Sequence, residues 1–146
     1  MSNQGGARYA ALLLRLTLGS LFTAHLYWKF ALLPGGLQRW WSNFGANGYH
    51  WLVPWYAISA EFVGALLLIP GIYTRWACIY AMPLMIGAAQ YWFVRKGFYF
   101  TGAGCELPVA WTIMLMVQAL LGDGAFCVKM PALPRERLQR ASVASV

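Results

Sequence analysis

The chain has 146 residues, of which 60% are hydrophobic and only 10% are charged. A soluble domain of this size needs more polar surface than such a composition provides, so the composition excludes an ordinary soluble protein and indicates a membrane protein. The formal net charge of +7 does not indicate nucleic-acid binding, because the basic residues lie at segment ends and in the C-terminal tail rather than in one patch.

The first apolar segment, residues 9–33, is predicted to be a retained membrane-spanning helix. It is too long for the core of a signal peptide, and no convincing cleavage site follows it. Because charged side chains in a span usually face the interior of the bundle, we expect its polar stripe to face the other helices. The stripe follows steps of three and four residues and consists of Arg15, Gly19, Phe22, Leu26 and Lys29, with His25 at its edge.

The next segment, residues 34–50, is predicted to be a connector at the membrane surface. Pro34, Gly35 and Gly36 end the first helix, and a Trp-rich amphipathic stretch is typical of the headgroup region. A second spanning helix follows at 51–70, which is about the 20 residues that a bilayer requires.

A third helix is predicted at 76–94 and a fourth at 106–121. The basic tail, residues 129–146, is predicted to be flexible. The predicted fold is therefore all-α, a four-transmembrane-helix bundle in residues 1–128 with no second domain.

The distribution of Lys and Arg predicts the orientation of this bundle. If both termini lie on one side, that side carries more basic residues than the other, which favours N- and C-termini in the cytoplasm. The cytoplasmic set is Arg8, Arg75, Lys129, Arg135, Arg137 and Arg140, against Lys29, Arg39, Arg95 and Lys96 on the outer side.

Glu61, at the centre of the second helix, is the main candidate for a functional residue. A carboxylate at this depth costs free energy unless it is neutralised, paired or directed toward a polar cavity. The alternative is a structural Glu that only holds helices together. At a rise of about 1.5 Å per residue, Glu61 lies within one or two turns in height of both His25 and Arg15. We therefore expect Glu61 to pair with one of these two, or with Gln90.

Tryptophan is unevenly distributed between the two predicted membrane interfaces. An ordinary aromatic belt would occupy both interfaces. The excess at the outer end is consistent with a heavy outer belt, a docking surface or an aromatic-lined pocket. The outer set is Trp28, Trp40, Trp41, Trp51, Trp55 and Trp92, whereas Trp76 alone is clearly at the inner end.

Four stretches, LLLRLTLGSLFTAHLYWKF, AEFVGALLLIPGIYTRWA, KGFYFTGAGCELPVAW and LGDGAF, together resemble the DoxX/DoxD-like family of small four-helix membrane proteins. The residues that carry the resemblance are Arg15, Lys29, Phe30, Glu61, Gly64, Gly71, Thr74, Arg75, Gly97, Phe98 and Glu106. The resemblance implies a bacterial inner-membrane protein, and a membrane subunit of a quinone- or sulfur/thiol-linked oxidoreductase complex similar to thiosulfate:quinone oxidoreductase. Its partners would then be the lipid bilayer and other protein subunits.

A quinone site needs an apolar slot, an aromatic wall and one or two hydrogen-bonding groups. Two other functions remain open: a non-catalytic membrane anchor or assembly partner, and a small-solute transporter with a path past Glu61. The candidate quinone-binding residues are Arg15, His25, Lys29, Glu61, Gln90 and Glu106, with Trp28, Trp55 and Trp92 as walls.

Several other chemistries are disfavoured by residue spacing. The three cysteines form no C-x-x-C pattern, which argues against a dithiol centre. The two histidines do not lie at matching depths for a bis-His haem. A metal held by His25, Glu61 and Glu106 would have suitable ligands but no diagnostic spacing. Glu106 also has a simpler role, because an acidic residue in a first helical turn stabilises the helix dipole.

Overall fold

The structure is a computed structural model, and it describes residues 3–128. The predicted basic tail lies outside the described residues. Within residues 3–128 the chain is helical and contains no strand, which confirms the all-α prediction. The elements are α1 (Asn3–Tyr27), a π-helix η1 (Trp28–Leu32), α2 (Gly36–Ala46), α3 (Leu52–Leu68), α4 (Thr74–Lys96), a short 3₁₀-helix η2 (Phe100–Gly102) and α5 (Glu106–Leu121).

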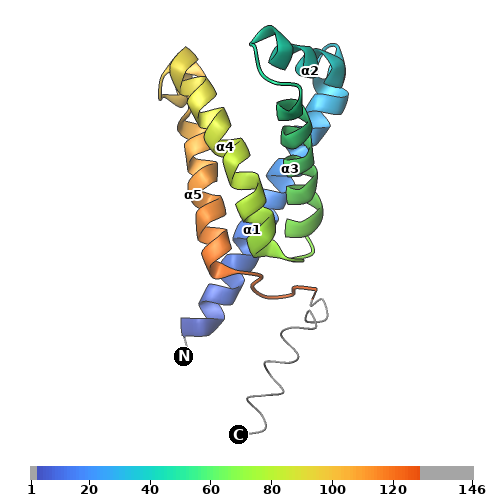
Figure 1. Ribbon diagram of the computed structural model, residues 1–146. Coiled ribbons are helices and arrows are strands. Elements are labelled where there is room, and N and C mark those ends of the chain that lie inside the picture. Colours follow the sequence, from blue (N-terminus) through green and yellow to red (C-terminus); the bar gives the residue numbers. More distant parts are fainter. Residues whose placement is uncertain (1–2, 129–146) are drawn as a thin grey trace, which may run out of the picture.

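The four long helices form two antiparallel pairs (Figure 1). One pair is α1 with α3, and the other is α4 with α5. Contacts of α3 with α4 and of α1 with α5 close the ring, and α2 lies across the end of the α1–α3 pair. Two helices are long and apolar enough to cross a membrane, Gly5–Leu32 and Thr74–Lys96, whereas α3 and α5 are shorter apolar helices.

The helix ends agree with the predicted ones except at the N-terminus and in the connector. The predicted fourth helix matches α5 at both ends, and α3 and α4 differ from prediction by at most two residues at each end. The first helix begins at Asn3 instead of residue 9, because its polar first residues continue the helix beyond the apolar run. It then widens into a π-helix that ends at Leu32.

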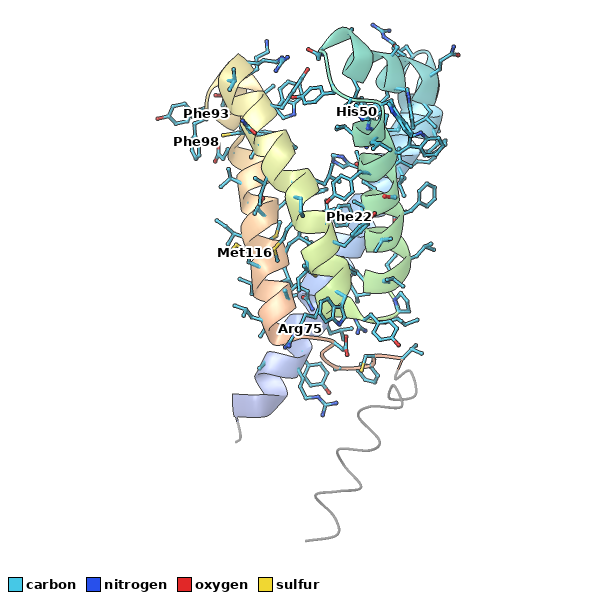
Figure 2. The ribbon with its side chains drawn as sticks, in the orientation of Figure 1. Phe22, His50, Arg75, Phe93, Phe98 and Met116 are labelled. Carbon is cyan, nitrogen blue, oxygen red and sulfur yellow. The ribbon has the colours of Figure 1, made fainter. Side chains whose placement is uncertain are left out.

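The connector contains a helix that the sequence analysis did not predict. In α2, Leu37, Trp40, Trp41 and Phe44 follow helical spacing and are all half-buried, while the residues between them are exposed. This apolar face turns toward η1 and α3. The segment is therefore amphipathic, as predicted, but it is ordered as a cover for one end of the bundle (Figure 2).

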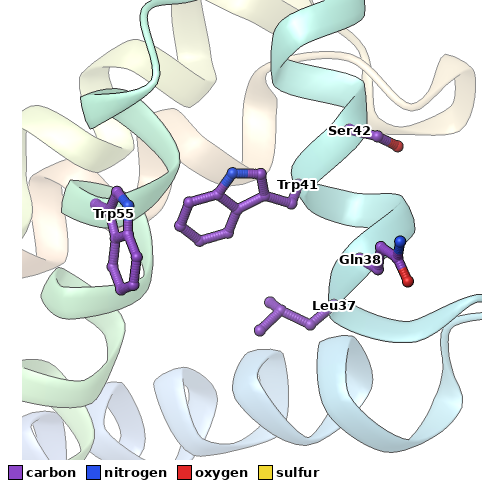
Figure 3. Close-up of a pocket in the computed structure, with 5 residues that line it drawn as sticks. All are labelled: Leu37, Gln38, Trp41, Ser42 and Trp55. Carbon is purple, nitrogen blue, oxygen red and sulfur yellow. The ribbon is translucent and has the colours of Figure 1, made fainter.

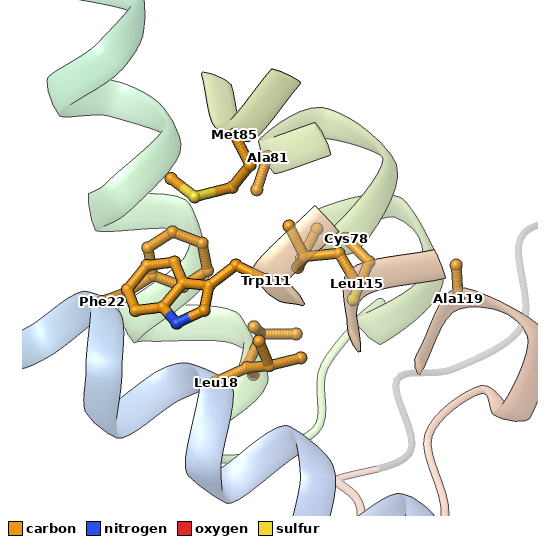
Figure 4. Packing of buried hydrophobic residues seen from close by; sticks show 10 residues of the cluster. Leu18, Phe22, Cys78, Ala81, Met85, Trp111, Leu115 and Ala119 are labelled. Atoms are coloured by element: carbon orange, nitrogen blue, oxygen red, sulfur yellow. The ribbon is translucent and has the colours of Figure 1, made fainter. Parts of the chain in front are cut away.

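The core lies between all four long helices (Figure 4). Phe22 of α1 meets Trp111 of α5 edge to face, with ring centroids 5.3 Å apart. Leu18 and Leu115 are fully buried beside them. Edge-to-face packing of this kind adds to the stabilisation from buried apolar area.

Glycines set the register of α1 against α3. A Cβ at Gly64 would lie 2.4 Å from the ring of Phe22, and a Cβ at Gly19 would lie 2.7 Å from Ile69. At each point a large side chain of one helix therefore packs directly on the bare glycine of the other, as small residues permit in membrane bundles. This antiparallel register places Lys29 at the height of Glu61.

Candidate functional site

The polar stripe of α1 faces the other helices, as predicted. Arg15 is 1% exposed and Lys29 is 4% exposed, and the residues between them on the stripe are buried as well. His25, at the edge of the stripe, is exposed. Two cationic side chains of one helix therefore enter the bundle, and each of them must find polar partners there.

Lys29 donates a hydrogen bond to Oε1 of Glu61, and the two residues form a buried ion pair. The expectation that Glu61 pairs with His25, Arg15 or Gln90 is therefore wrong. Lys29 is the partner because it lies at the height of Glu61 and on the buried stripe, and because its long stem can carry the ammonium group along an apolar surface.

The ammonium group of Lys29 lies against one aromatic ring. Its Nζ lies 4.3 Å from the ring centroid of Trp40, which reaches it from α2. A cation over an indole face is stabilised by the ring quadrupole. Phe30 follows Lys29 in the chain, and Phe62 follows Glu61. Their rings meet edge to face with centroids 6.2 Å apart, and both residues are exposed.

Lys29 also belongs to the π-helix η1, where the N–H of Leu33 donates to the carbonyl of Trp28 at 2.8 Å. Single π-turns are uncommon and occur often at functional sites. The second oxygen of the carboxylate adds a further feature: Oε2 of Glu61 is buried, and no donor in the described chain reaches it.

Arg15 occupies a separate site at the other end of the bundle. Its guanidinium donates to the backbone carbonyls of Asp123 at 2.6 Å, Ala125 at 3.1 Å and Phe126 at 2.9 Å. A Cβ at Gly71 would lie 1.6 Å from its Nη1, so the bare glycine makes room for the guanidinium. Arg15 therefore fixes the segment after α5 and does not reach Glu61.

A family model, DoxX, matches residues 10–96, more than half of the chain. The chain belongs to the DoxX family. No curated protein and no solved structure matches it. DoxX membership and the apolar helices indicate a membrane protein in contact with the lipid bilayer.

The DoxX match includes both residues of the ion pair but ends at the last residue of α4. Helix α5 and the carbonyls that bind Arg15 lie beyond it. Of the residues that formed the predicted resemblance, Gly97, Phe98 and Glu106 also lie outside the match. The Lys29–Glu61 pair is therefore part of the DoxX region, whereas the anchoring of Arg15 depends on the rest of the chain.

The other predicted polar residues of this DoxX protein make no hydrogen bond to the ion pair. The ring of His25 lies 4.9 Å from that of Trp111. Gln90 is exposed on α4. One carboxylate oxygen of Glu106 accepts the backbone N–H of Phe100 at 2.9 Å, so this residue orders the η2 turn. In the described chain, no group of three His, Cys, Asp or Glu side chains is arranged to hold a metal ion.

The predicted aromatic walls are exposed on the surface of the bundle. Trp28 is 46% exposed, Trp55 59% and Trp92 37%. Trp40, which was predicted only as part of the outer aromatic group, is the indole that covers the ion pair. Its position in the apolar face of an amphipathic segment is a signal for burial, but the sequence does not show what it covers.

A shallow depression of about 480 Å³ lies between α2 and α3 (Figure 3). The rings of Trp41 and Trp55 meet edge to face across it, with centroids 4.8 Å apart. Leu37, Gln38 and Ser42 complete its lining. It is an open apolar surface beside the cover of the ion pair.

Proposed function

We propose that the chain is a four-span bacterial inner-membrane protein with both termini in the cytoplasm, and that it is a membrane subunit of a quinone- or thiol-linked oxidoreductase complex. Its ligand site is the region of Lys29 and Glu61. The observation that carries the proposal is the buried ion pair beneath Trp40, in a chain of the DoxX family. Ionisable residues inside a membrane protein are costly, so they favour a functional role.

The helix lengths are compatible with four spans. Helices α3 and α5 have 17 and 16 residues, which gives lengths of about 26 and 24 Å at 1.5 Å per residue. Their flanking residues and tilt supply the rest of a hydrocarbon core of about 30 Å. The two longer helices span it outright.

The chemistry of the site suits a lipid-soluble ring. Trp40 supplies an aromatic face, Lys29 supplies a donor and Glu61 supplies an acceptor, which are the elements that a ring with polar substituents requires. His25, one turn before Lys29 on α1, is a fourth candidate contact. Arg15 and Glu106 are engaged elsewhere, so we do not include them in the proposed ligand set.

Quenching of tryptophan fluorescence by a short-chain ubiquinone analogue tests the proposal, because Trp40 adjoins the ammonium group. We expect saturable quenching, reduced by Trp40→Phe and by Lys29→Met. Trp76→Phe is the matched control, since Trp76 is 68% exposed at the opposite end of the bundle. Quenching that is only linear in the native protein, or that is equally reduced in the control, would contradict the proposal.

A second candidate function is that of a non-catalytic anchor or assembly partner. The observation that favours it is the apolar depression at Trp41 and Trp55, which offers exposed aromatic area to another subunit. If this is the function, replacing both tryptophans by alanine will reduce the size of the complex on a native gel of mildly solubilised membranes. Glu61→Gln would leave that size unchanged.

The apolar core argues against the third possibility, a solute path past Glu61. Arg15 and Lys29 are 14 positions apart on α1, which corresponds to about 21 Å. Leu18 and Phe22 are fully buried between them and pack against Trp111. On α1, this buried face between the two cationic residues is therefore apolar.

A further inference from the structure

The two oxygens of the Glu61 carboxylate have different surroundings. Oε1 accepts a hydrogen bond from Lys29, whereas Oε2 is buried and accepts none within the described chain. Glu61 as a whole is 3% exposed. A buried carboxylate oxygen without a donor is costly, and each such group in a native structure needs an explanation.

The other buried polar side chains, Arg15, Thr74 and Gln118, lie far from Glu61, and each also keeps one buried atom without a partner in the described chain. Arg15 donates to the carbonyls after α5. The backbone N–H of Thr74 donates to the Asp123 carboxylate at 3.1 Å, and the amide of Gln118 donates to the carbonyl of Gly122 at 2.8 Å. All three belong to the end of the bundle opposite to Lys29. None of these described groups donates to Oε2, so its position is open to a donor from outside the chain.

We propose that Glu61 Oε2 accepts a hydrogen bond from a hydroxyl group of a lipid-soluble ring, so that the site prefers the hydroquinone form of its ligand over the quinone form. This inference rests on the proposed function and specifies the ligand of the same site. An ionised carboxylate oxygen can accept hydrogen bonds but cannot donate them. The carbonyl oxygens of a quinone only accept, so they cannot satisfy Oε2, whereas a hydroquinone hydroxyl donates.

The surroundings of the pair favour a ligand that arrives from the hydrocarbon. Phe30 and Phe62, the residues that directly follow Lys29 and Glu61, form an edge-to-face contact with exposed outer surfaces of 52% and 41%. Trp40 covers the ammonium group from α2. A neutral ring can pass between apolar aromatic side chains without the desolvation cost that a charged solute would pay.

Isothermal titration calorimetry in detergent, without oxygen, tests the inference with three ligands that share one alkyl chain. These are an alkylated hydroquinone, its dimethyl ether and the matching quinone. We expect the full-length native protein to bind the hydroquinone at least about tenfold more tightly than the other two, because a hydrogen bond to a charged acceptor discriminates by that factor. The dimethyl ether keeps the ring and lacks the hydroxyl hydrogens.

Glu61→Gln provides the second measurement. Its amide oxygen can accept the hydrogen bond of Lys29, which turns the amide N–H₂ toward the former position of Oε2. A donor at this position suits a quinone carbonyl, so the variant should bind the quinone more tightly than the hydroquinone. Glu106→Gln is the matched control, because Glu106 is an exposed glutamate that only orders a turn. This variant should keep the native order of affinities.

The outcomes separate the inference from the proposed function. Saturable binding of the quinone as tight as that of the hydroquinone would overturn the inference and leave the proposed site intact. The same holds for a dimethyl ether that binds as tightly as the hydroquinone. If none of the three ligands binds saturably, the proposed function itself fails. The native protein alone distinguishes these cases, even if Glu61→Gln does not fold.

Discussion

The Lys29–Glu61 ion pair shows how strongly one side chain can depend on another inside this bundle. Both groups lose their hydration on burial, and only their mutual attraction and the Trp40 ring compensate for it. Removing one member of such a pair leaves a buried charge without a partner, whereas replacing both by apolar residues can be nearly neutral.

Lys29→Met should therefore lower the free energy of unfolding by about 3–5 kcal/mol. The double variant Lys29→Met with Glu61→Leu should recover most of this loss. Unfolding in mixed detergent micelles measures both, and Lys96→Met is the control because Lys96 is exposed at the end of α4. A single variant as stable as the native protein would show that the pair contributes little.

A second prediction concerns Gly71, beside Arg15. Gly71→Ala places a methyl group where Nη1 lies and also requires alanine to adopt a φ of 73°. The guanidinium must move, and residues 123–126 lose their anchor. Maleimide labelling of Cys127 should become faster, since a Cβ at Gly71 would lie 3.1 Å from the Cβ of Cys127.

Gly87→Ala is the control for this measurement, because nothing lies within 4 Å of a Cβ at Gly87. Labelling of Cys78 and Cys105, which are buried, should stay slow in both variants. An unchanged labelling rate at Cys127 in Gly71→Ala would mean that Arg15 does not hold this segment.

At the residue scale, the sequence predicted burial better than pairing. A charge in an apolar segment is expected to face the bundle, and this was confirmed for both Arg15 and Glu61. The partner depends on the register of α1 against α3, which close contacts at Gly19 and Gly64 determine. Nothing in a single sequence shows that these two glycines meet the opposite helix, so height alone left His25 and Arg15 as equal candidates.

At the scale of elements, the α1–α3 contact leaves little room for change. Gly64 and Phe22 are in direct contact, and neither helix can move away without separating Lys29 from Glu61. The ion pair therefore depends on packing one to two helical turns away. The Gly64–Phe22 contact can be tested without changing Lys29 or Glu61.

Gly64→Ala should destabilise the protein by about 1–3 kcal/mol, because the new methyl group would overlap the Phe22 ring. Adding Phe22→Leu should restore part of the loss, because a smaller side chain then faces the alanine. Thermal unfolding in detergent measures both variants. Equal destabilisation in Gly64→Ala with and without Phe22→Leu would contradict a direct contact.

Helices with a long apolar pattern could be predicted from the sequence, whereas short helices could not. Helix α5 was predicted with its observed ends, because a long apolar run begins at Glu106 and ends before Gly122. The 11 residues of α2 are amphipathic, but its apolar face could equally rest on lipid or on protein. The π-helix has no sequence signature at all, since one extra residue in a turn leaves the apolar pattern nearly unchanged.

At the scale of the whole molecule, the ring of four antiparallel helices places the connectors on two sides. The α2 segment and the η2 turn lie at one end, and the α3–α4 turn lies at the other end with the segment after α5 (Figure 1). A membrane around this ring would separate these two groups of connectors.

Fusions to alkaline phosphatase test this topology, because the enzyme is active only outside the cytoplasm. Fusions after Gly48 and Ala103 should be active, whereas fusions after Ile72 and Val128 should be inactive. Fusions to green fluorescent protein at the same four positions should show the opposite pattern. Active phosphatase after Ile72 would mean that the orientation predicted from Lys and Arg is inverted.

The class of the molecule could be predicted from composition, and its family from short stretches in the right order, because both depend on residue types rather than contacts. The separation of the polar residues into two sites could not be predicted from the sequence. It arises because the chain after α5 returns to Arg15, and the acceptors there are backbone carbonyls that any sequence would supply.

The anchoring of Arg15 also has a consequence for the order in which the protein is made. Its three carbonyl acceptors come 108 to 111 residues later in the chain. When α1 emerges during synthesis and enters the bilayer, its guanidinium has none of its final partners and must stay near the water interface. We therefore expect the first helix to reach its final depth only after the chain beyond α5 is complete, so that the insertion of α1 begins first and ends last.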